Sequence, residues 1–144
     1  MKKIINLFFI ATCAALLTGC ASGPRFNDVK ATFPAVGPDN GRIFFYRDSV
    51  AGAAVQPSVK LNGEEIGTAK PKGFFYVDRA PGTYEVATTT EVKRSLSLTL
   101  DKGQTRYVRF NIAIGFFVGH VYPELVENEV GEKEIASCKY TGSK

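Results

Sequence analysis

The chain has 144 residues, of which 44% are hydrophobic and 22% are charged, and its formal net charge at pH 7 is +4. This length and balance are typical of one globular domain, and they exclude a wholly disordered chain, which would be poorer in apolar residues. Because the positive charge is small and no run of like charges occurs, we expect no nucleic acid as a partner.

Residues 1–19 have the pattern of a secretory signal peptide. Lys2 and Lys3 precede a nearly continuous apolar run, 4–17, which is shorter than the roughly 20 residues of a membrane-spanning helix. The run ends in Leu17-Thr18-Gly19-Cys20, which resembles the lipobox of bacterial lipoproteins. That resemblance implies cleavage after Gly19 and lipidation of Cys20, so that membrane lipid is a partner. An uncleaved anchor and a plain secretory signal are the alternatives.

The residue after the cysteine bears on localisation. In lipoproteins of Gram-negative bacteria an aspartate there favours the inner membrane, so Ala21 implies the periplasmic face of the outer membrane in such a host. Cys13 is lost with the leader and Cys20 is acylated, so Cys138 has no partner for an intramolecular disulfide. We expect Cys138 to be either a buried, inert thiol or a bridge between two chains.

Residues 20–40 are predicted to be the lipidated N-terminus and a flexible tether. Prolines and glycines, among them Pro24, Pro34 and Gly37, interrupt any regular element there. Fully extended, such a tether reaches ~65 Å. Its apolar side chains leave open the alternative that part of it docks onto the domain; these are Phe26, Val29 and Phe33.

Residues 41–144 form the predicted domain, in which apolar and polar residues largely alternate with the period of a β-strand. The predicted strands are 42–47, 56–61, 74–78, 83–90, 95–100, 104–112 and 120–126. After the second of them, Asn62-Gly63 favours a two-residue hairpin of type I′. This hairpin would set Leu61 opposite Glu64, Lys60 opposite Glu65, and Val59 opposite Ile66.

About seven strands separated by short turns predict an all-β fold, an Ig-like antiparallel β-sandwich. The sequence has no helical crossover of the length that a parallel sheet requires. Residues 127–138 have a weak helical period, which predicts a short C-terminal helix.

The hairpin and the turn after it resemble PEGA-type domains. The matching segments are 59–63, 66–67 and 81–86, and the strand-turn-strand of 98–104 fits the same pattern. The whole layout, with its leader, lipobox, tether and Gly41-Arg42-Ile43 opening, is similar to a family of short bacterial envelope lipoproteins of unknown function. The resemblance implies a sandwich in the cell envelope and supplies no catalytic residues.

His120 is the single histidine, and it alternates with Tyr122 and Glu124. A His–Glu pair can act as a base, but no motif assigns a serine or cysteine nucleophile to it. One histidine and the free Cys138 are too few for a zinc site. We therefore expect no metal, no cofactor and no enzymatic activity, and a small envelope hydrolase built on His120 is the alternative.

Two regions are candidates for binding a partner. The apolar run 112–118 is either a buried strand or a glycine-hinged loop, with Phe116 predicted in the core and Phe117 accessible. Arg106, Tyr107 and Arg109, together with Arg42, Tyr46 and Arg47, are a candidate surface for a glycan or acidic polymer. Outward solvation of two strands explains the same residues.

These observations predict a membrane-anchored lipoprotein that serves as a non-catalytic binding or structural module in the cell envelope. Its expected partner is an unidentified envelope protein or peptidoglycan. Besides the hydrolase, a surface-exposed adhesion or exclusion factor is an alternative.

Overall fold

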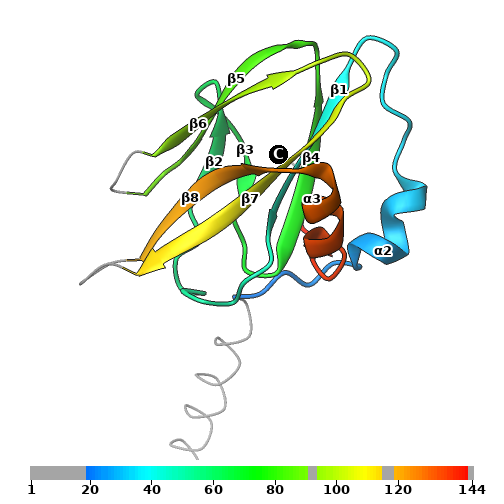
Figure 1. Ribbon diagram of the computed structural model, residues 1–144. Helices are drawn as coiled ribbons and strands as arrows, with labels where there is room; N and C mark the ends of the chain where they lie inside the picture. The colour runs from blue at the N-terminus through cyan, green and yellow to red at the C-terminus, as the bar shows by residue number, and fades with distance from the viewer. Residues whose placement is uncertain (1–18, 91–93, 115–118, 143–144) are drawn as a thin grey trace, which may run out of the picture.

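The computed structural model describes residues 19–90, 94–114 and 119–142, in which nine strands and three short helical elements are found (Figure 1). The elements in chain order are α2 (Phe26–Val29), η2 (Lys30–Thr32), β1 (Gly41–Arg47), β2 (Ser58–Leu61), β3 (Glu64–Thr68), β4 (Gly73–Arg79), β5 (Gly82–Thr88), β6 (Ser95–Leu100), β7 (Thr105–Ile114), β8 (Gly119–Val126), α3 (Asn128–Ile135) and β9 (Lys139–Tyr140). Every predicted strand is present, and α3 confirms the short C-terminal helix.

The strands form two sheets that pack face to face. Sheet A has the strand order β8-β7-β1-β4-β9, and sheet B has the order β3-β2-β5-β6. Alternate apolar residues of both sheets meet between them, as the period of two requires. The buried residues of this core are Ile43, Phe45, Val59, Leu61, Ile66, Ala69, Phe75, Val77, Val86, Leu98, Leu100, Val108, Phe110 and Val121. The predicted β-sandwich is therefore confirmed.

The antiparallel prediction is wrong at two strand pairs. Strand β1 pairs with β7 in parallel, from Arg42 opposite Thr105 to Tyr46 opposite Arg109, and β9 pairs with β4 in parallel. Between β1 and β7 the chain passes through sheet B, back to β4, and through sheet B again. Strands of the second sheet thus supply the crossover, so a parallel pair forms here without a crossover helix.

The predicted β2–β3 hairpin is present with positive φ at both turn residues, 49° at Asn62 and 86° at Gly63. Leu61 lies opposite Glu64 and Lys60 opposite Glu65, as predicted. The register then shifts, so that Val59 lies opposite Gly67 instead of Ile66. An extra residue on one strand is a β-bulge, and Val59 and Ile66 are both buried beside it.

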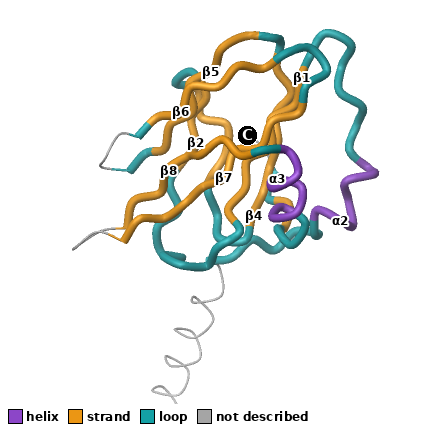
Figure 2. The backbone as a smooth tube through the Cα atoms, viewed as in Figure 1, coloured by secondary structure: helices purple, strands orange, loops and turns teal. Residues whose placement is uncertain are grey.

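Helices α2 and α3 form a third layer against sheet A (Figures 1 and 2). The Phe26 ring of α2 packs edge-on against Phe44 at 5.4 Å and against Phe74 at 5.3 Å between ring centroids. This second cluster comprises the buried residues Phe26, Phe44, Tyr46, Phe74, Tyr107, Ile135 and Cys138. Both faces of β1 are covered as a result, so all seven of its residues are buried.

The prediction of a flexible tether over residues 20–40 is wrong for much of that segment, and the docking alternative holds. Ala21 is 4% exposed and Phe26 is 6% exposed. The backbone N–H of Ala21 donates to the Pro71 carbonyl at 3.2 Å, and that of Phe26 donates to the Cys138 carbonyl at 2.9 Å. Apolar burial and backbone hydrogen bonds together hold the segment on the domain.

Two sequence predictions lie outside the described residues. They are the apolar core of the signal peptide and the placement of Phe116 and Phe117. Among the helices that the structure does describe, none has the length and apolar character needed to cross a membrane.

Candidate functional site

Cys20 lies at one end of the sandwich, where the described chain begins. Its side chain is exposed and it forms no disulfide. The preceding carbonyl, of Gly19, accepts a hydrogen bond from the side-chain amide of Gln56 at 2.7 Å. The next residue, Ala21, is already packed into the domain. The thiol predicted to be lipidated is thus accessible and immediately adjoins the fold.

The three residues proposed as a basic and aromatic surface do not lie together. Tyr107 is 3% exposed, stacks on Phe44 at 5.3 Å, and lies beneath Gly131 of α3. Arg106 belongs to the other alternation of β7, and its Nε donates to the Thr99 carbonyl of β6 at 3.1 Å. The prediction of a surface shared by Arg106, Tyr107 and Arg109 is therefore wrong, because Arg106 faces the opposite side of sheet A from the other two and Tyr107 is buried under α3.

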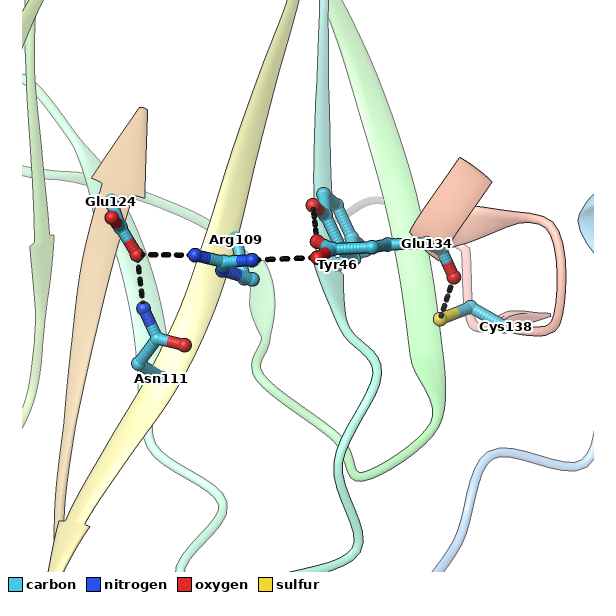
Figure 3. Close-up of polar contacts among 6 residues, drawn as sticks. All are labelled: Tyr46, Arg109, Asn111, Glu124, Glu134 and Cys138. Carbon is cyan, nitrogen blue, oxygen red and sulfur yellow. Dashed lines mark hydrogen bonds and ion pairs between the residues drawn. The ribbon is translucent and has the colours of Figure 1, made fainter. Parts of the chain in front are cut away.

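Arg109 is the centre of a polar network between sheet A and α3 (Figure 3). Its guanidinium binds Glu134 of α3 at 2.7 Å and Glu124 of β8 at 2.8 Å. Glu134 also accepts the Tyr46 hydroxyl at 2.5 Å, and Glu124 also accepts the Asn111 amide. The hydrogen bond with Glu124 raises the pKa of Arg109, and the same bond lowers the pKa of Glu124. Arg109 thus joins β7, β8 and α3, so its charge is already paired.

The remaining arginines of the proposed surface also have internal partners. Arg42 binds both carboxylate oxygens of Asp78, at 2.7 and 2.8 Å, and the Pro34 carbonyl at 2.8 Å. Arg47 is fully buried, and burial lowers its pKa. Its guanidinium donates to the carbonyls of Ala51, Gly52, Val55 and Ala69. These cations stabilise the fold and are not available to an acidic polymer.

The two titratable residues of the hydrolase alternative, His120 and Glu124, have different surroundings in the described part of the chain. Glu124 is bound to Arg109 and Asn111, and the buried Nδ1 of His120 has no hydrogen-bond partner among the described residues. Nor do these residues include a group of three or more histidines, cysteines or carboxylates placed to hold a metal ion.

Cys138 lies in the second cluster with no exposed surface. Its Sγ is 3.8 Å from the Arg47 carbonyl and 3.9 Å from the Glu134 carbonyl. Burial raises the pKa of the thiol to about 12, and thiols are nucleophilic only as thiolates. The expectation of a buried thiol is confirmed, and a bridge to a second chain is not compatible with this position.

The outer face of sheet B is a candidate surface that was not predicted from the sequence. Unlike sheet A, this sheet contributes no residue to the second cluster beneath the helices. Ser95, Ser97 and Thr99 are exposed along β6, and their alternation with leucines was the available signal. A shallow cleft of about 470 Å³ opens on this side, lined by Lys60, Glu85, Ala87, Thr88, Thr89, Thr90, Arg94 and Ser95.

The fold and the cysteine site define a small β-sandwich protein with a third, helical layer on one face. Residues 38–121, more than half of the chain, match a family described as a protein of unknown function, DUF2846. The chain belongs to this family. It is also similar to an uncharacterized protein of Haemophilus influenzae, with 28% identity over 141 residues that cover 94% of this chain and 84% of the relative. No solved structure matches the chain.

Proposed function

We propose that this protein is a lipoprotein of the bacterial cell envelope, anchored through acylated Cys20, whose sandwich acts as a non-catalytic binding or structural module. One observation carries the proposal. The exposed Cys20 is followed at once by Ala21, which is buried and hydrogen-bonded to the domain. The cleavage point that the lipobox implies therefore coincides with the edge of the folded domain. In a Gram-negative host, Ala21 favours the periplasmic face of the outer membrane.

The packing of the side chains supports a binding module over a hydrolase. The groups that resemble an acid–base pair or a nucleophile, Glu124 and Cys138, are engaged by hydrogen bonds and burial. The outer face of sheet B combines exposed hydroxyls with Lys60 and Glu85, a mixture suited to hydrogen-bonding a protein surface or a glycan. We assign the partner, an envelope protein or peptidoglycan, to this face.

The anchor is tested by metabolic labelling with an alkyne fatty acid. We expect Cys20→Ser to lose the label and to accumulate as precursor in the inner membrane, because the thiol is the acceptor of the lipid. Cys13→Ser and Cys138→Ser are the matched controls and keep the label. Label that persists on Cys20→Ser would refute the anchor.

The binding face is tested by photo-crosslinking in cells. A photoreactive residue at Ser97, exposed on β6, is expected to capture the partner. The control position is Lys133, exposed on α3. Adducts at Lys133 alone would place the partner on the helical layer. Protease treatment of intact cells separates this proposal from the surface-displayed adhesion factor, since a periplasmic domain is protected.

A further inference from the structure

The point of attachment has almost no spacer. Gly23 lies so close to β9 that a Cβ there would be 2.0 Å from the Tyr140 carbonyl oxygen, and the Tyr140 N–H donates to the Pro24 carbonyl at 2.8 Å. With Ala21 docked as well, Cys20 alone separates the fold from the lipid. One residue spans at most about 3.6 Å, and each headgroup layer is about 5–8 Å deep. If Cys20 is acylated as proposed above, the surface around it lies at headgroup level.

An exposed apolar loop lies beside the anchor point. Val50, in the loop between β1 and β2, is 57% exposed, and Ala51 and Ala54 are exposed with it. Gln56 places this loop beside the cleavage point, since its amide donates to the Ala53 carbonyl at 3.0 Å and, in the uncleaved chain, to the Gly19 carbonyl at 2.7 Å. The buried Arg47 guanidinium holds the loop by donating hydrogen bonds to the carbonyl groups of three loop residues, Ala51, Gly52 and Val55. The loop therefore presents Val50 from a held conformation next to Cys20.

Cations also gather at this end. Lys70 and Lys72 flank Pro71, whose carbonyl binds Ala21, and the Lys139 N–H donates to the Lys72 carbonyl at 2.8 Å. In the described ranges none of these three lysines has an acidic partner within ion-pair distance. Asp48 raises the pKa of the nearby Cys138 thiol whereas Lys72 lowers it, so an acid also lies near these lysines without forming an ion pair with them.

The opposite end of the sandwich differs in this respect. Three of its cations are paired with acids, as Arg42–Asp78, Arg79–Glu64 and Lys102–Asp39, whereas Arg106 donates to the Thr99 carbonyl. Strand β1 begins at that end and finishes near the anchor, since Arg42 bonds to Gln104 whereas Arg47 bonds to the loop at 51–55. Unpaired positive charge and an exposed apolar side chain thus coincide at the anchor end, the combination that binds an anionic membrane surface.

We propose that the end of the sandwich carrying Cys20 is a membrane-contacting surface, which inserts Val50 into the interface and binds the anionic headgroups of phospholipids through Lys70, Lys72 and Lys139. The acyl anchor and this surface together fix the orientation of the domain. The β2–β3 hairpin and the turn after β6 then point away from the membrane. The outer face of sheet B is then roughly perpendicular to the membrane and accessible to a partner.

The test uses the acylated full chain in vesicles of phosphatidylglycerol and phosphatidylcholine, or of phosphatidylcholine alone. An environment-sensitive dye is attached at Ala54→Cys near the anchor or, as the matched control, at Asp101→Cys at the far end; both positions are exposed. A single dye per chain reports that Cys20 is acylated, since Cys138 is buried. Flotation reports anchoring, and quenching by headgroup-labelled lipid reports contact.

We expect quenching at Ala54→Cys to exceed that at Asp101→Cys several-fold in anionic vesicles, and to fall to the control level when Lys70, Lys72 and Lys139 are replaced by Gln. The floated fraction is expected to stay unchanged. Equal quenching at the two positions, or quenching indifferent both to lipid charge and to the three lysines, overturns the membrane-contacting surface. Loss of flotation with two dyes per chain instead refutes the proposed acylation.

Discussion

Gly63 is the second residue of the β2–β3 turn and has φ of 86°. A β-branched residue is strained at positive φ, and no atom lies within 4 Å of a Cβ built there, so the cost of a side chain is one of backbone conformation alone. We predict that Gly63→Val lowers the free energy of unfolding by ~1–2 kcal/mol. Denaturant unfolding measures it. Gly63→Asn, which tolerates positive φ, should cost less, and equal losses for the two variants would contradict this explanation.

Tyr107 links stability to pH. Burial raises its pKa to about 12, with a further contribution from Glu132, whereas an unfolded tyrosine titrates near pH 10. Because the folded-state pKa is the higher one, this contribution to stability is complete below about pH 10 and is lost as the pH rises toward 12. We predict that the free energy of unfolding falls by about 2–3 kcal/mol less in Tyr107→Phe than in the wild type between pH 10 and pH 12.

Urea unfolding at a series of pH values measures this difference. Below pH 9 the two proteins should differ by a constant amount, since the tyrosine is protonated in both states. Burial also raises the pKa of Tyr46, which adds to the alkaline loss in both proteins. Parallel curves from pH 7 to pH 12 would show that Tyr107 does not titrate differently on folding.

At the scale of single residues, the sequence predicts the conformations that are determined by residues adjacent in the chain. The Asn62-Gly63 turn requires two positive φ values, and the identity of those two residues is sufficient to predict it. Arg109 is different because its partner Glu134 lies 25 residues away on α3, and Tyr46 lies 88 residues from the same carboxylate. The alternating pattern of β7 is the same whether its arginine is exposed to solvent or is paired in a polar network under α3. The sequence pattern therefore does not distinguish the two arrangements.

Helix α2 is the element that converts the expected tether into part of the fold. Phe26 is 6% exposed and contacts Phe44 and Phe74 edge-on. We predict that Phe26→Ala costs ~3–5 kcal/mol, as for other buried phenylalanines. Asn27→Ala, at an exposed position of the same helix, should change stability by no more than ~0.5 kcal/mol. Thermal and denaturant unfolding compare the two variants. A Phe26→Ala variant as stable as the wild type would show that residues 20–40 are a flexible tether and not part of the fold.

The other elements show why their prediction succeeded or failed. Strand β6 has one covered and one open face, so its leucines alternate with hydroxyl residues and its predicted bounds are those observed. Strand β1 is covered on both faces and therefore lacks this alternation. Strand β9 has only two residues, and α2 has four residues among prolines. Such short elements exist because of tertiary contacts and have little signal of their own.

At the scale of the whole molecule, the two-sheet sandwich was predictable and its strand order was not. Period-two runs and turn residues predict the longer strands and their buried faces, whereas the two-residue β9 was not predicted. The parallel pairing of β1 with β7 depends on how the chain alternates between the sheets, which leaves no local mark. The candidate site followed the same rule, since Cys20 was recognisable from its neighbours whereas the lysines around it are brought together by the fold.

We propose that the mature protein begins with an acylated Cys20, which is followed directly by the docked Ala21. The most direct measurement is mass spectrometry of the tryptic N-terminal peptide from protein purified from membranes. Arg25 is the first tryptic site after the cysteine, so we expect a peptide of residues 20–25 that carries a thioether-linked diacylglycerol. A peptide that continues through the Gly19–Cys20 bond, or residues 20–25 with a free, alkylatable thiol, would contradict it.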